Sequence, residues 1–76
     1  MSMLIQALGY DVATSTLGVQ FQDGAIYHYA GVTPAVYAGL LGAKSLGSHF
    51  GQHVRPHYPG VQQAQKADWI QGVPHG

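Results

Sequence analysis

The chain has 76 residues, including three basic and three acidic side chains, five histidines, eleven glycines and no cysteine. A single domain of this size buries only about 60% of the surface that its unfolded chain exposes, and without cysteine it has neither disulfides nor thiolate metal sites. No segment approaches the roughly 20 apolar residues of a membrane span, and the N-terminus lacks the features of a secretory signal, so we expect a cytoplasmic protein with no membrane partner.

The first part of the chain predicts an antiparallel meander of three strands. The segments are Leu4–Asp11, Thr16–Phe21 and Ala25–Ala30. Apolar and polar residues alternate most clearly in the second segment, as is typical of a half-buried strand. The Asp23-Gly24 pair that follows is typical of a hairpin turn, because glycine adopts left-handed backbone conformations at no steric cost.

The length of this turn decides on which face Tyr27 and Tyr29 lie. A two-residue loop would place both tyrosines on the far side from Leu17 and Val19. A three-residue loop, a type I turn closed by a glycine bulge, pairs Val19 with Tyr27 and Leu17 with Tyr29. We favour the three-residue loop because it gathers the apolar side chains on one face and leaves His28 on the other.

Two short helices are predicted next. Thr33 suits the N-cap of a helix over Pro34–Leu41, which Gly42 ends as a C′ residue. Ser45 caps a second helix, roughly Leu46–Arg55. Apolar side chains spaced four apart form the predicted buried face of this second helix: Leu46, Phe50 and Val54.

Residues 59–76 are polar and rich in glutamine, and we interpret them as a flexible C-terminal tail. The apolar pair Trp69-Ile70 is the exception, and it is suited to docking on the body or on a neighbouring subunit. The predicted fold class is therefore α+β: a three-stranded antiparallel meander followed by two short helices and a flexible tail.

The order of several short motifs resembles the KTSC domain, a module named after the C-terminus of some lysyl-tRNA synthetases. GYD, LGVQF, a glycine turn and the YHY of Tyr27–Tyr29 match its front half, and VTP, VY, AKSLGSHF and HYP match its back half. The resemblance covers about residues 4 to 58, so we take residues 1–58 as the domain and residues 59–76 as the tail. It implies a compact α+β module, found alone in bacteria and phages or appended to larger proteins, with RNA or DNA binding suggested.

The start of the second predicted helix is a candidate phosphate site. Backbone N–H groups and the helix dipole favour an anion at such a position, and a lysine, two hydroxyls and a small glycine lie together there. The candidate residues are Lys44, Ser45, Gly47 and Ser48. The structural alternative is that Ser45 merely caps the helix and Ser48 completes its first turn.

A second candidate is a nucleic-acid surface on the same helix. Between Lys44 and His57 the chain carries two full positive charges and three histidines, with no acidic residue, and aromatic side chains are available to stack on bases. The candidate residues are Tyr27, Tyr29, His49, His53, Arg55 and Tyr58. Two charges predict weak binding with a shallow salt dependence, and tyrosines more often pack in a core than stack on bases.

Metal and catalytic sites are not expected. His49 and His53 are spaced for one helix face, but no nearby third ligand completes a metal site, and no other cofactor is indicated. The three aspartates lie in turns or in the tail, so no carboxylate pair is available, and a serine–histidine pairing would lack an orienting acid. We therefore do not expect an enzyme.

Three functions remain, and we favour the first. It is a non-catalytic RNA- or DNA-binding module of the KTSC type. The alternative is a homo-oligomer that binds a small phosphate-bearing ligand, such as a nucleotide, where subunits meet around Ser45–Gly47. A protein-interaction adaptor is third. The low charge and the small glycine-rich core favour self-association, so we expect a homo-oligomer in each case.

Overall fold

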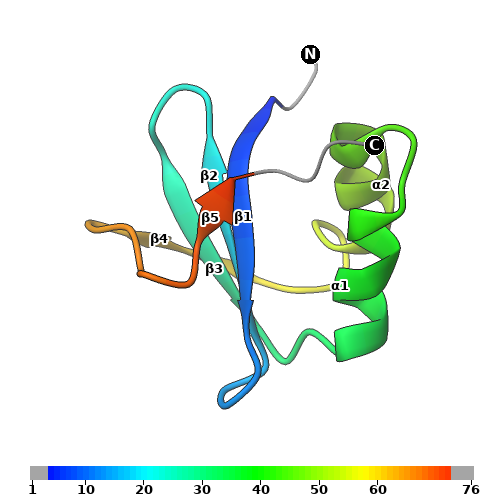
Figure 1. The fold of residues 1–76 in the computed structure, drawn as a ribbon, viewed down its shortest axis with the longest axis horizontal. Coiled ribbons are helices and arrows are strands. Elements are labelled where there is room, and N and C mark those ends of the chain that lie inside the picture. Colours follow the sequence, from blue (N-terminus) through cyan, green and yellow to red (C-terminus); the bar gives the residue numbers. More distant parts are fainter. Residues whose placement is uncertain (1–3, 73–76) are drawn as a thin grey trace.

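The computed structural model describes residues 4–72, which form one antiparallel sheet with two helices packed on one face (Figure 1). Five strands build the sheet: β1 (Ile5–Asp11), β2 (Thr16–Phe21), β3 (Ile26–Ala30), β4 (Gly60–Gln63) and β5 (Gln71–Gly72). Their spatial order is β4-β3-β2-β1-β5. The helices are α1 (Pro34–Leu41) and α2 (Leu46–His53). No helix within residues 4–72 has the length and apolar character needed to cross a membrane.

The β2–β3 hairpin has the predicted three-residue loop. The backbone N–H of Phe21 donates to the carbonyl oxygen of Ala25 at 2.9 Å, and Gly24 adopts a φ of 93°, which is a left-handed conformation that favours glycine. Val19 accordingly pairs with Tyr27 across the hairpin. Because side chains alternate along a strand, this register places the tyrosines of β3 on the face that the helices cover.

The main core lies between the sheet and the helices. Phe50 of α2 has no exposed surface, and its ring meets those of Phe21 and Tyr29 edge-on, with centroids 5.9 and 5.3 Å apart. Val54 is also fully buried and Leu46 packs against the same cluster, which confirms the predicted apolar face of α2. The buried members of the cluster are Leu8, Leu17, Val19, Tyr29, Val32, Leu40, Phe50 and Val54.

Both helices begin at the predicted caps. The Thr33 hydroxyl accepts a hydrogen bond from the backbone N–H of Val36 at 3.3 Å, and the Ser45 hydroxyl accepts one from the N–H of Ser48 at 3.4 Å. Each bond satisfies one of the N–H groups that the first turn of a helix leaves without an intrahelical partner.

The helix ends differ in detail from the prediction. Helix α2 ends at His53 rather than Arg55, because the N–H of Arg55 donates to the carbonyl oxygen of Phe50, five residues back, at 3.1 Å. That bond interrupts the regular i→i−4 pattern. Gly42 is the C-cap of α1 with a φ of −93°, so it is not the left-handed C′ residue that we expected.

The prediction of three strands is wrong, because the segment expected to be a polar tail adds a strand to each edge of the sheet. Val61 of β4 pairs with His28 of β3, and Gly72 of β5 pairs with Ala7 of β1. Such edge pairing uses backbone groups, so glutamines and glycines support it without any apolar alternation. Residues 73–76 of the predicted tail lie outside the described residues.

The chain between these edge strands covers the face of the sheet away from the helices (Figure 1). We call residues 64–72, which cross this face and end in β5, the C-terminal arm. Ile70 of the arm is only 2% exposed and packs with Ala7 and Ile26, and Trp69 lies beside this second, smaller cluster. The apolar pair noted in the sequence therefore docks on its own sheet.

Candidate functional site

The predicted phosphate site lies at the start of α2. Lys44, Ser45 and Ser48 are exposed, and Gly47 is half-buried. The Ser45 hydroxyl accepts the N–H of Ser48, and the Ser45 carbonyl oxygen accepts the N–H of His49 at 2.9 Å. Ser45 thus caps α2, which is the structural role that the sequence analysis gave as the alternative to phosphate binding. Lys44 extends the exposed surface next to the cap.

The two histidines of α2 lie ring against ring. The centroids of His49 and His53 are 4.2 Å apart, with an interplanar angle of 34°. A Cβ built on Gly39 of α1 would lie 3.3 Å from Nε2 of His49, so this ring is held against α1, whereas His53 is exposed. Among residues 4–72, no group of three or more His, Cys, Asp or Glu side chains is placed to hold a metal ion.

Tyr29 is a core residue rather than an accessible stacking surface. Its side chain is 6% exposed, and Phe50 and Gly60 cover it from α2 and β4. Burial raises the pKa of the Tyr29 hydroxyl above its ordinary value of 10.0, while the charge of Arg55 opposes the increase and Tyr27 adds to it. The ring of Tyr27 lies next to that of Tyr29 on the same face of β3, with the centroids 6.5 Å apart.

The remaining aromatic candidates keep part of their surface in solvent. Tyr27 and Tyr58 are half-buried and pack against the main core. The ring of Tyr27 contacts Phe21 edge-on at 5.9 Å. Each of the two tyrosines can therefore offer a partner only a portion of its ring.

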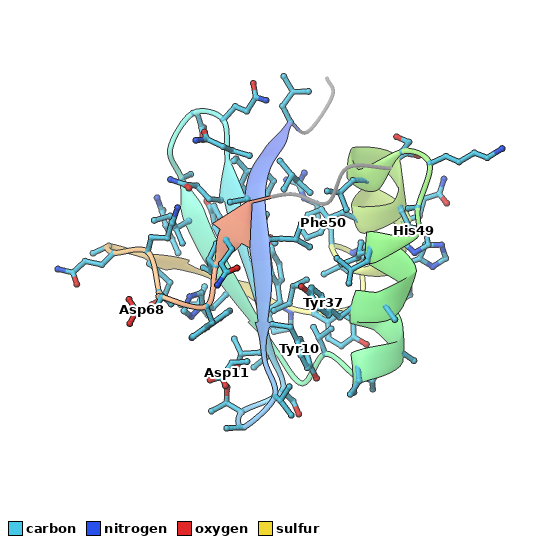
Figure 2. The ribbon with its side chains drawn as sticks, viewed as in Figure 1. Tyr10, Asp11, Tyr37, His49, Phe50 and Asp68 are labelled. Atoms are coloured by element: carbon cyan, nitrogen blue, oxygen red, sulfur yellow. The ribbon has the colours of Figure 1, made fainter. Side chains whose placement is uncertain are left out.

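The acidic residues lie away from the helices, as Figure 2 shows for Asp11 and Asp68 relative to His49. Asp11 accepts a hydrogen bond from the N–H of Ala13 at 3.2 Å, and Asp23 in the next turn accepts one from its own i+2 neighbour at 3.0 Å. These carboxylates stabilise turns. The third, Asp68, belongs to the C-terminal arm, so residues 34–58 carry basic residues and histidines without any acidic side chain.

Residues 1–58 match the family model of the KTSC domain. The chain belongs to the KTSC domain family. The match confirms the family that the order of motifs indicated. It also ends before β4, so both edge strands and the C-terminal arm follow the matched region in this KTSC protein.

Three relatives illustrate the settings in which the family occurs. An uncharacterized protein of Stutzerimonas stutzeri is 47% identical over 58 residues, which are 75% of this chain and 82% of the relative. A protein of Tsukamurella paurometabola is 40% identical over 60 residues, 79% of this chain and 90% of the relative. A lysine–tRNA ligase of Nostoc punctiforme is 35% identical over 52 residues, which are 68% of this chain but only 9% of the ligase.

Sequence reasoning missed the contact surface on the other face of the KTSC sheet. Gly9 of β1 pairs with Gly18 of β2, and Gly18 pairs with His28 of β3. Trp69 and Ile70 pack on this row. The signal in the sequence was the pair of glycines within two adjacent predicted strands, because glycine inside a strand often marks the close approach of another segment.

Proposed function

We propose that this KTSC module is a non-catalytic nucleic-acid-binding domain that contacts its ligand with the helical side of the fold. The segregation of charge carries this proposal. Lys44, Arg55 and three histidines lie within residues 34–58, while Asp11 ends β1, Asp23 lies in the β2–β3 turn and Asp68 lies in the C-terminal arm. A basic surface without acidic neighbours attracts phosphates, and nucleic-acid-binding proteins concentrate their positive charge in this way.

The lysine–tRNA ligase among the relatives supports the same proposal. The name of that enzyme states that it acts on tRNA, and the region similar to this chain is 9% of its length. A small appended module that contacts RNA would suit such a protein. A single-domain relative of similar length, such as the Stutzerimonas stutzeri protein, would use the same surface alone.

The charges set the expected strength of binding. Two full positive charges that contact a single strand predict a slope of log K against log salt of roughly −1.4, since each neutralised phosphate contributes about −0.7. A base stacked on an aromatic ring adds about 1–3 kcal/mol, and the exposed parts of Tyr27 and Tyr58 are the rings available. Weak binding with a shallow salt dependence is therefore the expected behaviour.

A matched pair of lysines tests the proposal. Lys44 lies beside α2, whereas Lys66 lies on the opposite face of the sheet, with its Nζ 3.4 Å from Oε1 of Gln20. Binding of a labelled single-stranded RNA is followed by fluorescence anisotropy for the wild type, Lys44→Ala and Lys66→Ala. We expect Lys44→Ala to weaken binding several-fold and Lys66→Ala to leave it nearly unchanged. Equal effects of the two substitutions, or no binding by the wild type, would refute the proposal.

A small phosphate-bearing ligand is the second candidate, and the exposure of Lys44, Ser45 and Ser48 at the start of α2 favours it. A nucleotide or inorganic phosphate would then compete fully with the RNA. Against this candidate, the Ser45 hydroxyl already accepts the N–H of Ser48. If phosphate displaces the RNA only at concentrations where any salt would weaken binding, the nucleic-acid surface is favoured. If the protein binds neither RNA nor a small phosphate ligand, a protein-interaction adaptor is favoured.

A further inference from the structure

On the face of the sheet away from the helices, two glycines of adjacent strands lie side by side. Gly9 and Gly18 lie directly opposite each other on β1 and β2, and we call this pair the glycine platform. His28 continues the same row on β3. With no side chain at the first two positions, backbone and side chains of another segment can approach the sheet closely.

Trp69 and Ile70 of the C-terminal arm occupy the glycine platform. A Cβ on Gly9 would overlap the carbonyl oxygen of Trp69, and a Cβ on Gly18 would lie 2.5 Å from Cδ1 of Ile70 and 2.6 Å from Cζ3 of Trp69. The indole also contacts the ring of His28, with the centroids 5.1 Å apart. A larger residue at Gly9 would therefore displace the backbone of the arm, and one at Gly18 would displace the side chains of Ile70 and Trp69.

The backbone pairing between the arm and the sheet is short. Strand β5 of the arm pairs with β1 through two residues only, Gln71 and Gly72. Residues 64–66, the part of the arm that follows β4, are exposed. Nε2 of His28 is buried next to the indole and has no hydrogen-bond partner among the described residues. Packing of the arm on its own sheet therefore leaves this buried polar atom unsatisfied.

The platform and its occupant belong to different parts of the chain. Gly9 and Gly18 lie within the region that matches the KTSC family, whereas residues 64–72 follow it. The arm is therefore a short segment outside the matched region that packs on it and is joined to it through exposed residues. An identical segment from another molecule would make the same contacts, and such an exchange is a low-cost route to a dimer.

We propose that the glycine platform is a peptide-binding site and that a second copy of this chain supplies its other occupant. Residues 64–72 of each copy cross to the partner, seat Trp69 and Ile70 on the partner's platform, and add β5 to the edge of the partner's β1. The dimer forms when residues 64–66 extend between the two bodies. This site lies on the opposite face of the sheet from the proposed nucleic-acid surface and does not depend on it.

A complementation experiment tests the exchange, because Trp69 is the only tryptophan in the chain. The donor variant, Gly18→Val, keeps its arm but has a blocked platform. The acceptor variant carries Trp69→Ala and Ile70→Ala, so it has an open platform and no tryptophan. We expect mixing to shift the donor's tryptophan emission to shorter wavelength and to give a one-to-one complex by native mass spectrometry.

The control is an acceptor that also carries Gly18→Val, which should cause no shift. The proposal would be overturned if the wavelength of the donor's tryptophan emission were the same with the open acceptor as with the blocked acceptor. Amide circular dichroism of each variant checks that the helices and the main core have formed.

A second measurement uses a protein close to the wild type and does not require either variant to fold with an empty platform. Ala7 and Gly72 face each other across β1 and β5, and the chain has no cysteine. The variant Ala7→Cys/Gly72→Cys is incubated at high concentration and oxidised. Covalent dimers that are absent from both single-cysteine variants support exchange. Disulfides formed only within one chain would overturn it.

Discussion

Gly60 lies against the ring of Tyr29, so closely that a Cβ on Gly60 would stand 2.6 Å from Cε2 of the tyrosine. On another side, the ring of Phe50 meets Tyr29 edge-on at 5.3 Å. The second tyrosine of the YHY motif is thus enclosed between α2 and a strand that follows the family-matched region. Tyr29 is therefore a core residue, and its ring holds β4 and α2 together.

The contact between Gly60 and Tyr29 predicts the effect of adding one methyl group. Gly60→Ala should destabilise the protein by about 1–3 kcal/mol, because the buried ring has little freedom to move away. Gly72→Ala is the matched control, since a Cβ there meets nothing within 4 Å. Urea unfolding measures both free energies. Equal values for the two variants would show that β4 does not press on the ring.

Burial of Tyr29 predicts a loss of stability at alkaline pH. Its pKa in the folded state lies above the ordinary value of 10.0, chiefly because burial disfavours the charged form. The contribution of the neutral hydroxyl is therefore fully present below pH 10.0 and is lost as the pH rises through the higher folded-state pKa. Thermal unfolding as a function of pH should show a steeper alkaline decline in the wild type than in Tyr29→Phe. Parallel curves would contradict this.

Phe50 is expected to be the most sensitive position of the core. It is fully buried and joins α2 to the sheet through Phe21 and Tyr29. Phe50→Ala should cost about 3–5 kcal/mol, which is a large part of the stability of a small domain. The control Leu41→Ala, at a side chain that is 40% exposed, should cost much less in the same denaturant titration. A small effect of Phe50→Ala on the free energy of unfolding would show that this side chain is not central to the core.

The turn of the hairpin gives another prediction. Gly24 has a φ of 93°, and a side chain in a left-handed conformation costs about 1–2 kcal/mol. Gly24→Ala should therefore lower the free energy of unfolding by about that amount. Gly42→Ala, at a φ of −93°, is the control and should have little effect. If both changes are neutral, the loop does not have the bulged geometry.

Local signals made the hairpin and the helices predictable. The glycine turn set the register that pairs Val19 with Tyr27, and Thr33 and Ser45 marked the helix starts. The edge strands β4 and β5 were missed because their pairing joins residues far apart in the sequence and needs no apolar pattern.

The surroundings of the candidate site residues were predictable only in part. The sequence identified the basic residues beside α2, and the structure leaves Lys44 exposed there. The register predicted which face Tyr29 would take, but not that Gly60 would cover it, because that contact depends on the unpredicted strand β4. The glycine platform was missed because the C-terminal arm that packs on it follows the part of the chain that resembles the KTSC domain.

The most direct test of nucleic-acid binding is a map of the amide resonances that a ligand perturbs. The wild-type protein, labelled with ¹⁵N, is titrated with a short single-stranded RNA at low salt. We predict that the shifts cluster in residues 44–58, along α2 and the segment after it, and that they diminish as salt is added. Shifts centred on Gly9, Gly18 and Trp69, or no shifts at all, would contradict a nucleic-acid surface on the helical side.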